Sequence, residues 1–294
     1  MDAQAEALDT TEWTRKLLAH FRSPRYQPPL LPIIAVEIMA LSQQREASTA
    51  EIVLVLSKDP LLAAQVLTRA QSSAYARGNE TRTLHDAVMK LGLRVLRNIV
   101  FEVSLNTRVF QAPPGYTEAM ERLRVHSVAT AHLASLVARR TGQAQDYAFL
   151  AGLLHDVGIA GLFIALADLP NPPPLTTAWP DILRFHTEAS AALAHLWRLP
   201  RELQGALANH HGLTVNGEPD PLTATVVVAE RFAFELAPLI GKDPSTPDRP
   251  RIMPGKDVSA GPVIQGACKL LGIDAPAFAA LHAEARALLA SVLG

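Results

Sequence analysis

Apolar residues recur at helical spacing along almost the whole 294-residue chain, and helix-start signals recur with them. Residues 48–51 form a capping box ahead of an apolar run, and Asp59-Pro60 pairs an N-cap with a proline at the first helical position. Residues 83–86 have the form of another cap, and Gly92 is expected to end the helix that follows, ahead of a further helix over about 93–110. No Asn-Gly or Asp-Gly hairpin between alternating strands is evident. The sequence therefore predicts an all-α protein.

Breaks rich in proline and glycine divide these helices into blocks. Loops are expected at 112–115, 170–180 and 212–221, and His186 is expected to open a helix. The predicted organisation is an N-terminal helix within 1–24, a main domain over 25–240 made of helical subdomains at 25–111 and 117–240, a Pro-rich linker over 241–262, and C-terminal helices over 263–294. We expect the last helices to pack on the chain's own core.

Composition excludes several classes of protein. Apolar residues make up 49% and charged residues 19% of the chain, which is too apolar for a disordered protein. The 27 Lys and Arg residues are balanced by 28 Asp and Glu, unlike a generic basic nucleic-acid binder. The polar N-terminus does not resemble a signal peptide, and the apolar run 157–167 is shorter than the roughly 20 residues that a membrane span needs. With one cysteine, Cys268, we expect a cytoplasmic protein that is not bound to a membrane.

The pair His155-Asp156 is the most informative local feature. It ends an apolar run at 148–154, where an imidazole and a carboxylate are costly to bury unless they are paired or bound to a metal. His126, from another helix, and Glu230 would complete one metal site. Asp156 would then bridge to a second ion held by His186, His210 and His211. A buried His–Asp hydrogen bond without metal is the alternative.

At these residues the sequence resembles the HD superfamily of metal-dependent phosphohydrolases. The order of the histidines and acidic residues is that of its HD-GYP branch, the cyclic-di-GMP phosphodiesterases. The resemblance is closer to the HDOD family, the HD-related output domains of bacterial signalling, and it covers about residues 25–240. It is carried by Asp59-Pro60-Leu61, residues 67–72, residues 87–92, the run 148–158, Leu196 to Pro200 and residues 208–211. The resemblance implies an HD-superfamily helical domain with an N-terminal helical subdomain packed against it.

Three departures bear on catalysis. HD-GYP enzymes follow the HD pair with Gly-Lys, and that lysine helps to bind phosphate, whereas here Ile159 follows Gly158. The GYP loop is absent after His211, and Glu230 stands in place of the final Asp. The ligand set thus survives while the groups that handle substrate do not.

Three functions remain to be weighed. The favoured one is a regulatory output module that binds a signalling protein or a nucleotide second messenger, without established catalysis. The second is a metal-dependent phosphohydrolase that uses Fe, Mn, Zn or Ni, with Arg122, Arg124 and Arg184 as generic phosphate contacts. The third is nucleic-acid or nucleotide binding through basic residues of the first block, which are more simply explained as a solvated face (Arg69, Arg82, Lys90, Arg94 and Arg97). Nucleic acid is not expected as a partner, and a homodimer is left open.

Overall fold

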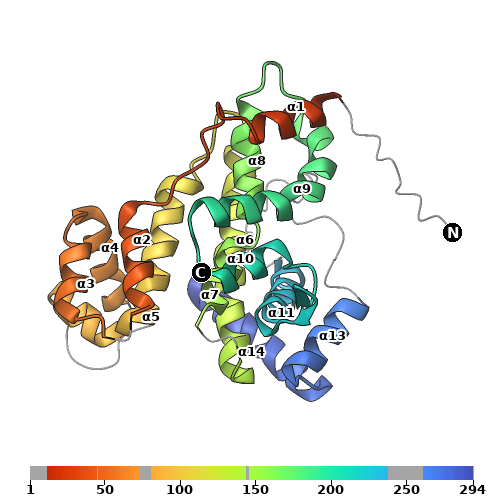
Figure 1. The fold of residues 1–294 in the computed structure, drawn as a ribbon. Helices are drawn as coiled ribbons and strands as arrows, with labels where there is room; N and C mark the ends of the chain where they lie inside the picture. The colour runs from red at the N-terminus through yellow and green to blue at the C-terminus, as the bar shows by residue number, and fades with distance from the viewer. Residues whose placement is uncertain (1–11, 45, 73–80, 144–145, 238–260, 294) are drawn as a thin grey trace.

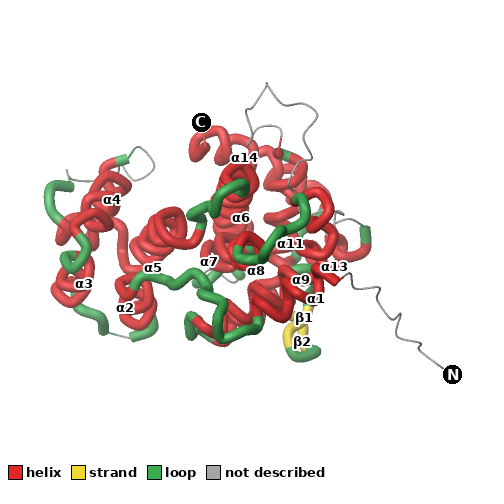
Figure 2. The backbone as a smooth tube through the Cα atoms, turned by 90° about the horizontal axis from the view of Figure 1, so that it is seen from above, coloured by secondary structure: helices red, strands yellow, loops and turns green. Residues whose placement is uncertain are grey.

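The computed structural model describes residues 12–44, 46–72, 81–143, 146–237 and 261–293. Within these residues the protein is built from helices, and the two strands form a single short hairpin. Figures 1 and 2 show two lobes, a smaller one made by α2 to α5 and a larger one around α6 to α11, which α1, α13 and α14 extend. The predicted all-α fold is confirmed.

The smaller lobe contains α2 (Ile33–Ser42), α3 (Thr49–Leu56), α4 (Pro60–Gln71) and α5 (Leu84–Ser104), which continues into the π-helix η2 (Leu105–Val109). Its helix starts are those that the sequence predicts. The Ser48 side chain accepts the Glu51 N–H at 3.2 Å, Asp59 accepts the Leu62 N–H at 3.0 Å, and Thr83 accepts the Asp86 N–H at 3.0 Å. Gly92 breaks the path of α5 with φ 71° and ψ 159°, as the predicted stop requires.

The larger lobe contains α6 (Thr117–Thr141), α7 (Ala148–Leu154), α8 (Val157–Ala167), α9 (Leu175–Leu196), α10 (Arg201–Ala208) and α11 (Pro221–Glu235). Helices α7 and α8 occupy its centre, and every residue of α7 is buried. The stretch Ala148–Ala167 passes a length and hydropathy test for a membrane span, but 94% of its apolar window is buried inside the protein. This stretch therefore forms part of the core of the larger lobe.

The chain ends add helices to the larger lobe. Helix α1 (Glu12–Phe21) lies on α8, and nearby the Tyr26 hydroxyl donates to the Gly161 carbonyl at 2.9 Å. Helix α13 (Pro262–Leu271) packs on α11, and α14 (Ala275–Leu293) packs on α6. Arg140 of α6 is bound to Glu284 of α14 at 2.7 Å. The expected packing of the C-terminal helices on the chain's own core is confirmed.

Several predicted details are wrong. The loop expected over 170–180 ends early, because Pro174 is the N-cap of α9 and Pro180 lies inside that helix, as its sixth residue. His186 consequently lies in the second half of α9 and does not open a helix. The loop 212–221 contains a hairpin, β1 (Thr214–Val215) with β2 (Glu218–Pro219). Its turn is Asn216-Gly217, with φ of 53° and 85°, a tight turn that favours this dipeptide. The predicted linker over 241–262 lies outside the described residues except for its last two.

Candidate metal centre

Five structural elements bring the predicted ligands together. His126 lies in α6, His155-Asp156 at the junction of α7 and α8, and His186 in α9. His210 and His211 follow the end of α10, and Glu230 lies in α11. The side chains of five of the seven are almost completely buried, with relative exposures of 0 to 3% (His126, His155, Asp156, His186 and His210).

The helix break at His155-Asp156 turns both side chains into the centre. Asp156 has φ −100° and ψ 14°, so α7 ends there and α8 begins at the next residue. Asp156 holds the N-cap position of α8, yet its side chain makes no capping hydrogen bond. The carboxylate is therefore directed at the histidines and not at the start of its own helix.

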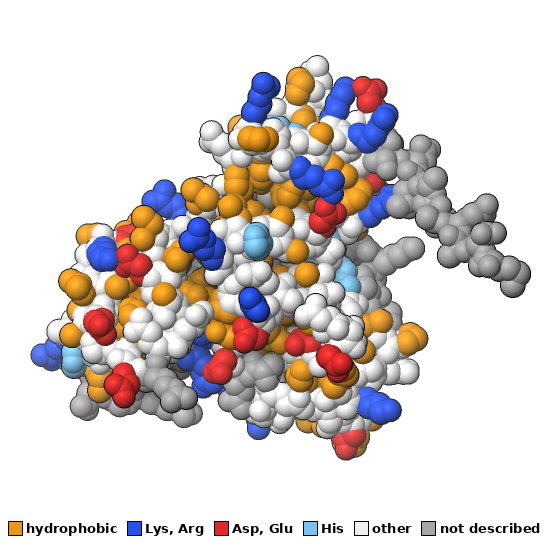
Figure 3. Space-filling view, viewed as in Figure 1, with side chains coloured by type: hydrophobic (Ala, Val, Ile, Leu, Met, Phe, Trp, Pro, Cys, Tyr) orange, Lys and Arg blue, Asp and Glu red, His pale blue; other side chains and the backbone are white. Residues whose placement is uncertain are grey.

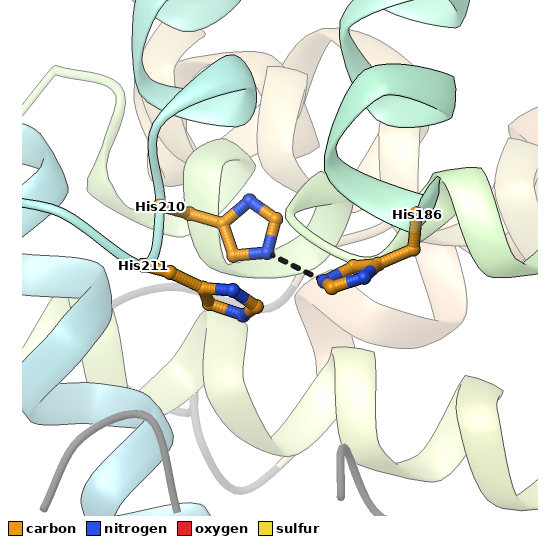
Figure 4. A group of neighbouring side chains, drawn as sticks. All are labelled: His186, His210 and His211. Atoms are coloured by element: carbon orange, nitrogen blue, oxygen red, sulfur yellow. Dashed lines mark hydrogen bonds between the residues drawn. The ribbon is translucent and has the colours of Figure 1, made fainter. Parts of the chain in front are cut away.

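Each oxygen of Asp156 faces a different group of histidines. Oδ2 lies 3.3 Å from His155 Nε2 and 3.7 Å from His126 Nε2. Oδ1 lies 3.3 Å from His186 Nε2 and 3.5 Å from His210 Nε2. Two groups have potential ligand atoms within 4.8 Å of one another, the first formed by His126, His155 and Asp156 and the second by His186, His210 and His211. Figure 4 shows the three rings of the second group directed toward one another. This is the arrangement expected if Asp156 joins two positions.

Backbone hydrogen bonds fix which ring nitrogen carries the proton. In each of three histidines, Nδ1 lies 2.6 to 2.9 Å from the carbonyl oxygen three residues earlier, so Nδ1 is the donor (His155, His186 and His210). In the neutral ring Nε2 then bears a lone pair, which is the usual tautomer of a metal-bound histidine.

In their neutral rings, the Nε2 atoms of His155, His186 and His210 are consequently acceptors. Two pairs of Nε2 atoms lie 3.2 Å apart, one between His126 and His155 and one between His186 and His210. Neither oxygen of Asp156 has a hydrogen-bond donor of acceptable geometry. Buried acceptors at such distances repel one another unless a cation lies between them. These residues thus fit a divalent metal ion. When no metal is bound, a proton can lie between the paired acceptors instead.

The pKa values of these groups describe that metal-free case. Burial lowers the pKa of His155, but the Asp156 carboxylate outweighs it and raises the pKa to about 9. Burial, reinforced by the neighbouring histidines, lowers the pKa of His126 to about 4 and that of His211 to about 3. Despite its burial, the pKa of Asp156 lies well below its usual value because His155 stabilises the carboxylate. The ionised Asp156 and the neutral His126 and His211 are thus already in the protonation states that bind metal, whereas His155 must lose a proton to become a ligand.

Glu230 and His211 form the edge of this cluster. His211 Nε2 lies 4.0 Å from Glu230 Oε1, and their side chains are 22% and 8% exposed. Glu230 is close enough to help raise the pKa of His155, although it belongs to neither compact group of ligand atoms. The structure therefore brings all seven predicted residues into one cluster, with Glu230 at its periphery.

Comparison with known proteins identifies the family. Residues 29–213 match the model of the HDOD domain, which is more than half of the chain. The chain belongs to the HDOD family.

Solved structures of other proteins share its fold. A Geobacter sulfurreducens HDOD domain protein of unknown function is 25% identical, with a TM-score of 0.65 over 95% of this chain and 98% of that one. A Shewanella amazonensis SB2B protein, provisionally named a metal-dependent phosphohydrolase, is 17% identical with a TM-score of 0.66 over 93% and 96% of the two chains, and shows the fold alone. An uncharacterized Treponema pallidum (strain Nichols) protein is 28% identical over 74% of this chain, which spans only 44% of that relative.

The residue that replaces the phosphate-binding lysine, and the three arginines expected as phosphate contacts, are engaged within the fold. Ile159 is 1% exposed and packs in the apolar core. Arg122 and Arg124, expected as generic phosphate contacts, pair with Glu118 and Glu121 on their own helix. The Arg184 guanidinium lies over the Phe185 ring, 5.3 Å from its centroid. In the described residues these three side chains thus have contacts on their own helices.

The sequence did not predict the residues that hold His155-Asp156 in place. Gly152 touches α6, where an added Cβ would lie 2.6 Å from the Thr130 carbonyl oxygen. Gly158 touches α9 in the same way, and the Ser190 hydroxyl binds the backbone on both sides of Asp156. A signal was present, because Ser190 follows His186 by four residues and therefore shares its face of a helix.

Proposed function

We propose that this HDOD protein is a cytoplasmic regulatory output module whose core holds divalent metal at His126, His155, Asp156, His186, His210, His211 and Glu230, without phosphodiester turnover. The observation that carries the metal assignment is the convergence of lone-pair acceptors on both oxygens of Asp156. Histidine and carboxylate ligands suit Fe, Mn, Zn and Ni. A bound ion would neutralise the buried carboxylate and join four helices to the loop that follows α10.

Burial is what argues against turnover. A phosphodiester must reach the ion, yet the five central ligands are at most 3% exposed. The position that carries a phosphate-binding lysine in HD-GYP enzymes is a buried isoleucine, Ile159. A divalent ion supplies Lewis acidity and lowers the pKa of water, but catalysis also requires access and groups that position the substrate.

Phosphohydrolase activity remains the second candidate because the ligand set is complete and Asp156 faces both groups of histidines. Cyclic di-GMP would then be the substrate class.

Regulation requires a surface that recognises a partner, and the smaller lobe supplies exposed apolar side chains. Eight large apolar residues of the described chain are exposed, and six of them lie in residues 30–89 (Leu30, Ile33, Val36, Leu54, Leu61 and Met89). Figure 3 shows apolar side chains at the surface of this lobe. Such exposure supports a signalling protein as partner, or a second copy of the chain.

Nucleic acid is disfavoured by the contacts of the basic residues in the smaller lobe. Arg69 pairs with Glu102, and the Lys90 ammonium donates to the Ala70 carbonyl and to Thr81. Arg97 is 4% exposed and donates to the Asp146 carbonyl. Three of the five basic residues of this set thus have partners within the fold, which weakens the case for a phosphate-binding face.

Metal analysis and a phosphodiesterase assay test the proposal together. The purified protein is analysed for metal by mass spectrometry and assayed with cyclic di-GMP and bis-p-nitrophenyl phosphate in Mn²⁺ or Fe²⁺. We expect bound metal and no turnover. Turnover that Asp156→Ala abolishes would establish the phosphohydrolase instead.

A further inference from the structure

Ser190 bridges the two backbone groups that flank Asp156. Its hydroxyl accepts the Gly158 N–H at 2.9 Å and donates to the His155 carbonyl oxygen at 2.8 Å. The side chain is completely buried in α9, one helical turn beyond His186. One hydroxyl therefore joins residues 155–158 to α9, the helix that carries His186.

The Gly158 N–H is one of the donors that every helix start leaves without a partner in its own helix. Asparagine, aspartate and serine at the N-cap normally satisfy such donors, and Asp156 occupies the N-cap of α8. Its side chain nevertheless makes no capping hydrogen bond. Ser190 supplies the cap from a neighbouring helix, so the carboxylate is not needed there.

Close backbone contact between α8 and α9 allows Ser190 to reach the start of α8. An added Cβ on Gly158 would lie 2.2 Å from the His186 carbonyl oxygen and 2.4 Å from the Ser190 nitrogen. Helix α8 therefore lies directly on α9, and the serine hydroxyl reaches its first turn without strain. The same contact holds His186 Nε2 at 3.3 Å from Asp156 Oδ1.

We propose that Ser190 is a positioning residue of the metal centre, acting as a surrogate N-cap that keeps the Asp156 carboxylate directed at the histidines. Without the hydroxyl, the Gly158 N–H has no cap, and Asp156 is the nearest group that can supply one. Turning toward its own helix would withdraw Asp156 from both groups of histidines. This inference rests on the proposed metal function.

The test measures Mn²⁺ and Zn²⁺ dissociation constants by calorimetry or chelator competition for the full chain and its variants. We expect Ser190→Ala to weaken binding about 10-fold, as loss of a group that orients a ligand does. Ser190→Thr keeps the hydroxyl and should remain within about 3-fold of the natural protein. Ser42→Ala is the matched control and should leave binding unchanged, because the Ser42 hydroxyl of the smaller lobe likewise donates to a carbonyl oxygen, that of Met39, and accepts an N–H, that of Arg97.

A double-mutant comparison separates positioning from general loosening of the fold. If Ser190 acts through Asp156, Ser190→Ala changes the residual binding of Asp156→Asn by less than about twofold. An undiminished effect in that background overturns the inference, as does a Ser190→Ala constant equal to that of the natural protein. A Ser190→Thr variant that is as weak as Ser190→Ala also overturns it. A natural protein that binds neither metal refutes the proposed function itself.

Discussion

Substitution of Gly158 by alanine should damage both stability and metal binding. The new Cβ would lie 2.2 Å from the His186 carbonyl oxygen, whereas ordinary contacts begin at 3.4 Å. Helices α8 and α9 must therefore separate by about 1 Å, which also stretches the 2.9 Å bond from the Gly158 N–H to Ser190.

The free-energy cost follows from these displacements. Overpacking of a buried contact costs about 1 to 3 kcal/mol, and loss of a buried hydrogen bond adds about 1 kcal/mol. Alanine returns about 1 kcal/mol through its better helix propensity. We therefore expect Gly158→Ala to lower the free energy of unfolding by about 2 kcal/mol and to move His186 away from Asp156.

Gly161 provides a control in the same helix. Its added Cβ would meet side-chain atoms only, the nearest being Leu193 Cδ1 at 3.1 Å and the Tyr26 hydroxyl oxygen at 3.2 Å. Gly161→Ala should stay within about 1 kcal/mol of the natural protein and bind metal normally, because these atoms can move. Urea denaturation and metal content measure both variants. Equal stability and equal metal content of the two variants would refute the packing argument.

Three further results are expected. In protein treated with chelator, the raised pKa of His155, about 9 against an ordinary 6.5, makes its contribution to stability complete below pH 6.5. That contribution is lost as the pH rises through 9, so denaturation midpoints should fall over this range, and Asp156→Asn should flatten the profile. Gly92→Ala should destabilise the fold by about 1 to 2 kcal/mol, because only glycine accepts its φ of 71° without strain; an unchanged urea midpoint would contradict this. Thr83→Ala should lower the free energy of unfolding by about 1 kcal/mol by removing the cap on Asp86, to be compared in urea with Thr68→Ala at an exposed position inside α4.

The sequence predicted the helices best where a local signal marks their ends. The caps at Ser48, Asp59 and Thr83 and the break at Gly92 are local, because each depends on residues within one turn. Pro180 misled the prediction because proline usually ends or kinks helices, whereas α9 continues through it. The Asn216-Gly217 hairpin was missed because its strands are only two residues long and show no alternation.

The sequence predicted which residues form the candidate site, but not which residues hold them in place. His155-Asp156 at the end of an apolar run pointed to buried chemistry, and the separated histidines were joined by their order along the chain. The hydrogen bonds of Ser190 and the close contacts of Gly152 and Gly158 depend on how α6, α8 and α9 pack together. Such contacts arise from packing between distant segments, which local patterns do not encode.

Metal content of the purified protein tests the central claim most directly. Inductively coupled plasma mass spectrometry on the natural protein and on Asp156→Asn, both confirmed as folded by circular dichroism, gives the number of ions per chain. The acceptors that converge on Asp156 predict divalent metal in the natural protein and its loss from the variant. A folded natural protein that holds no divalent metal, even after incubation with Mn²⁺, Fe²⁺, Zn²⁺ or Ni²⁺, would contradict the account.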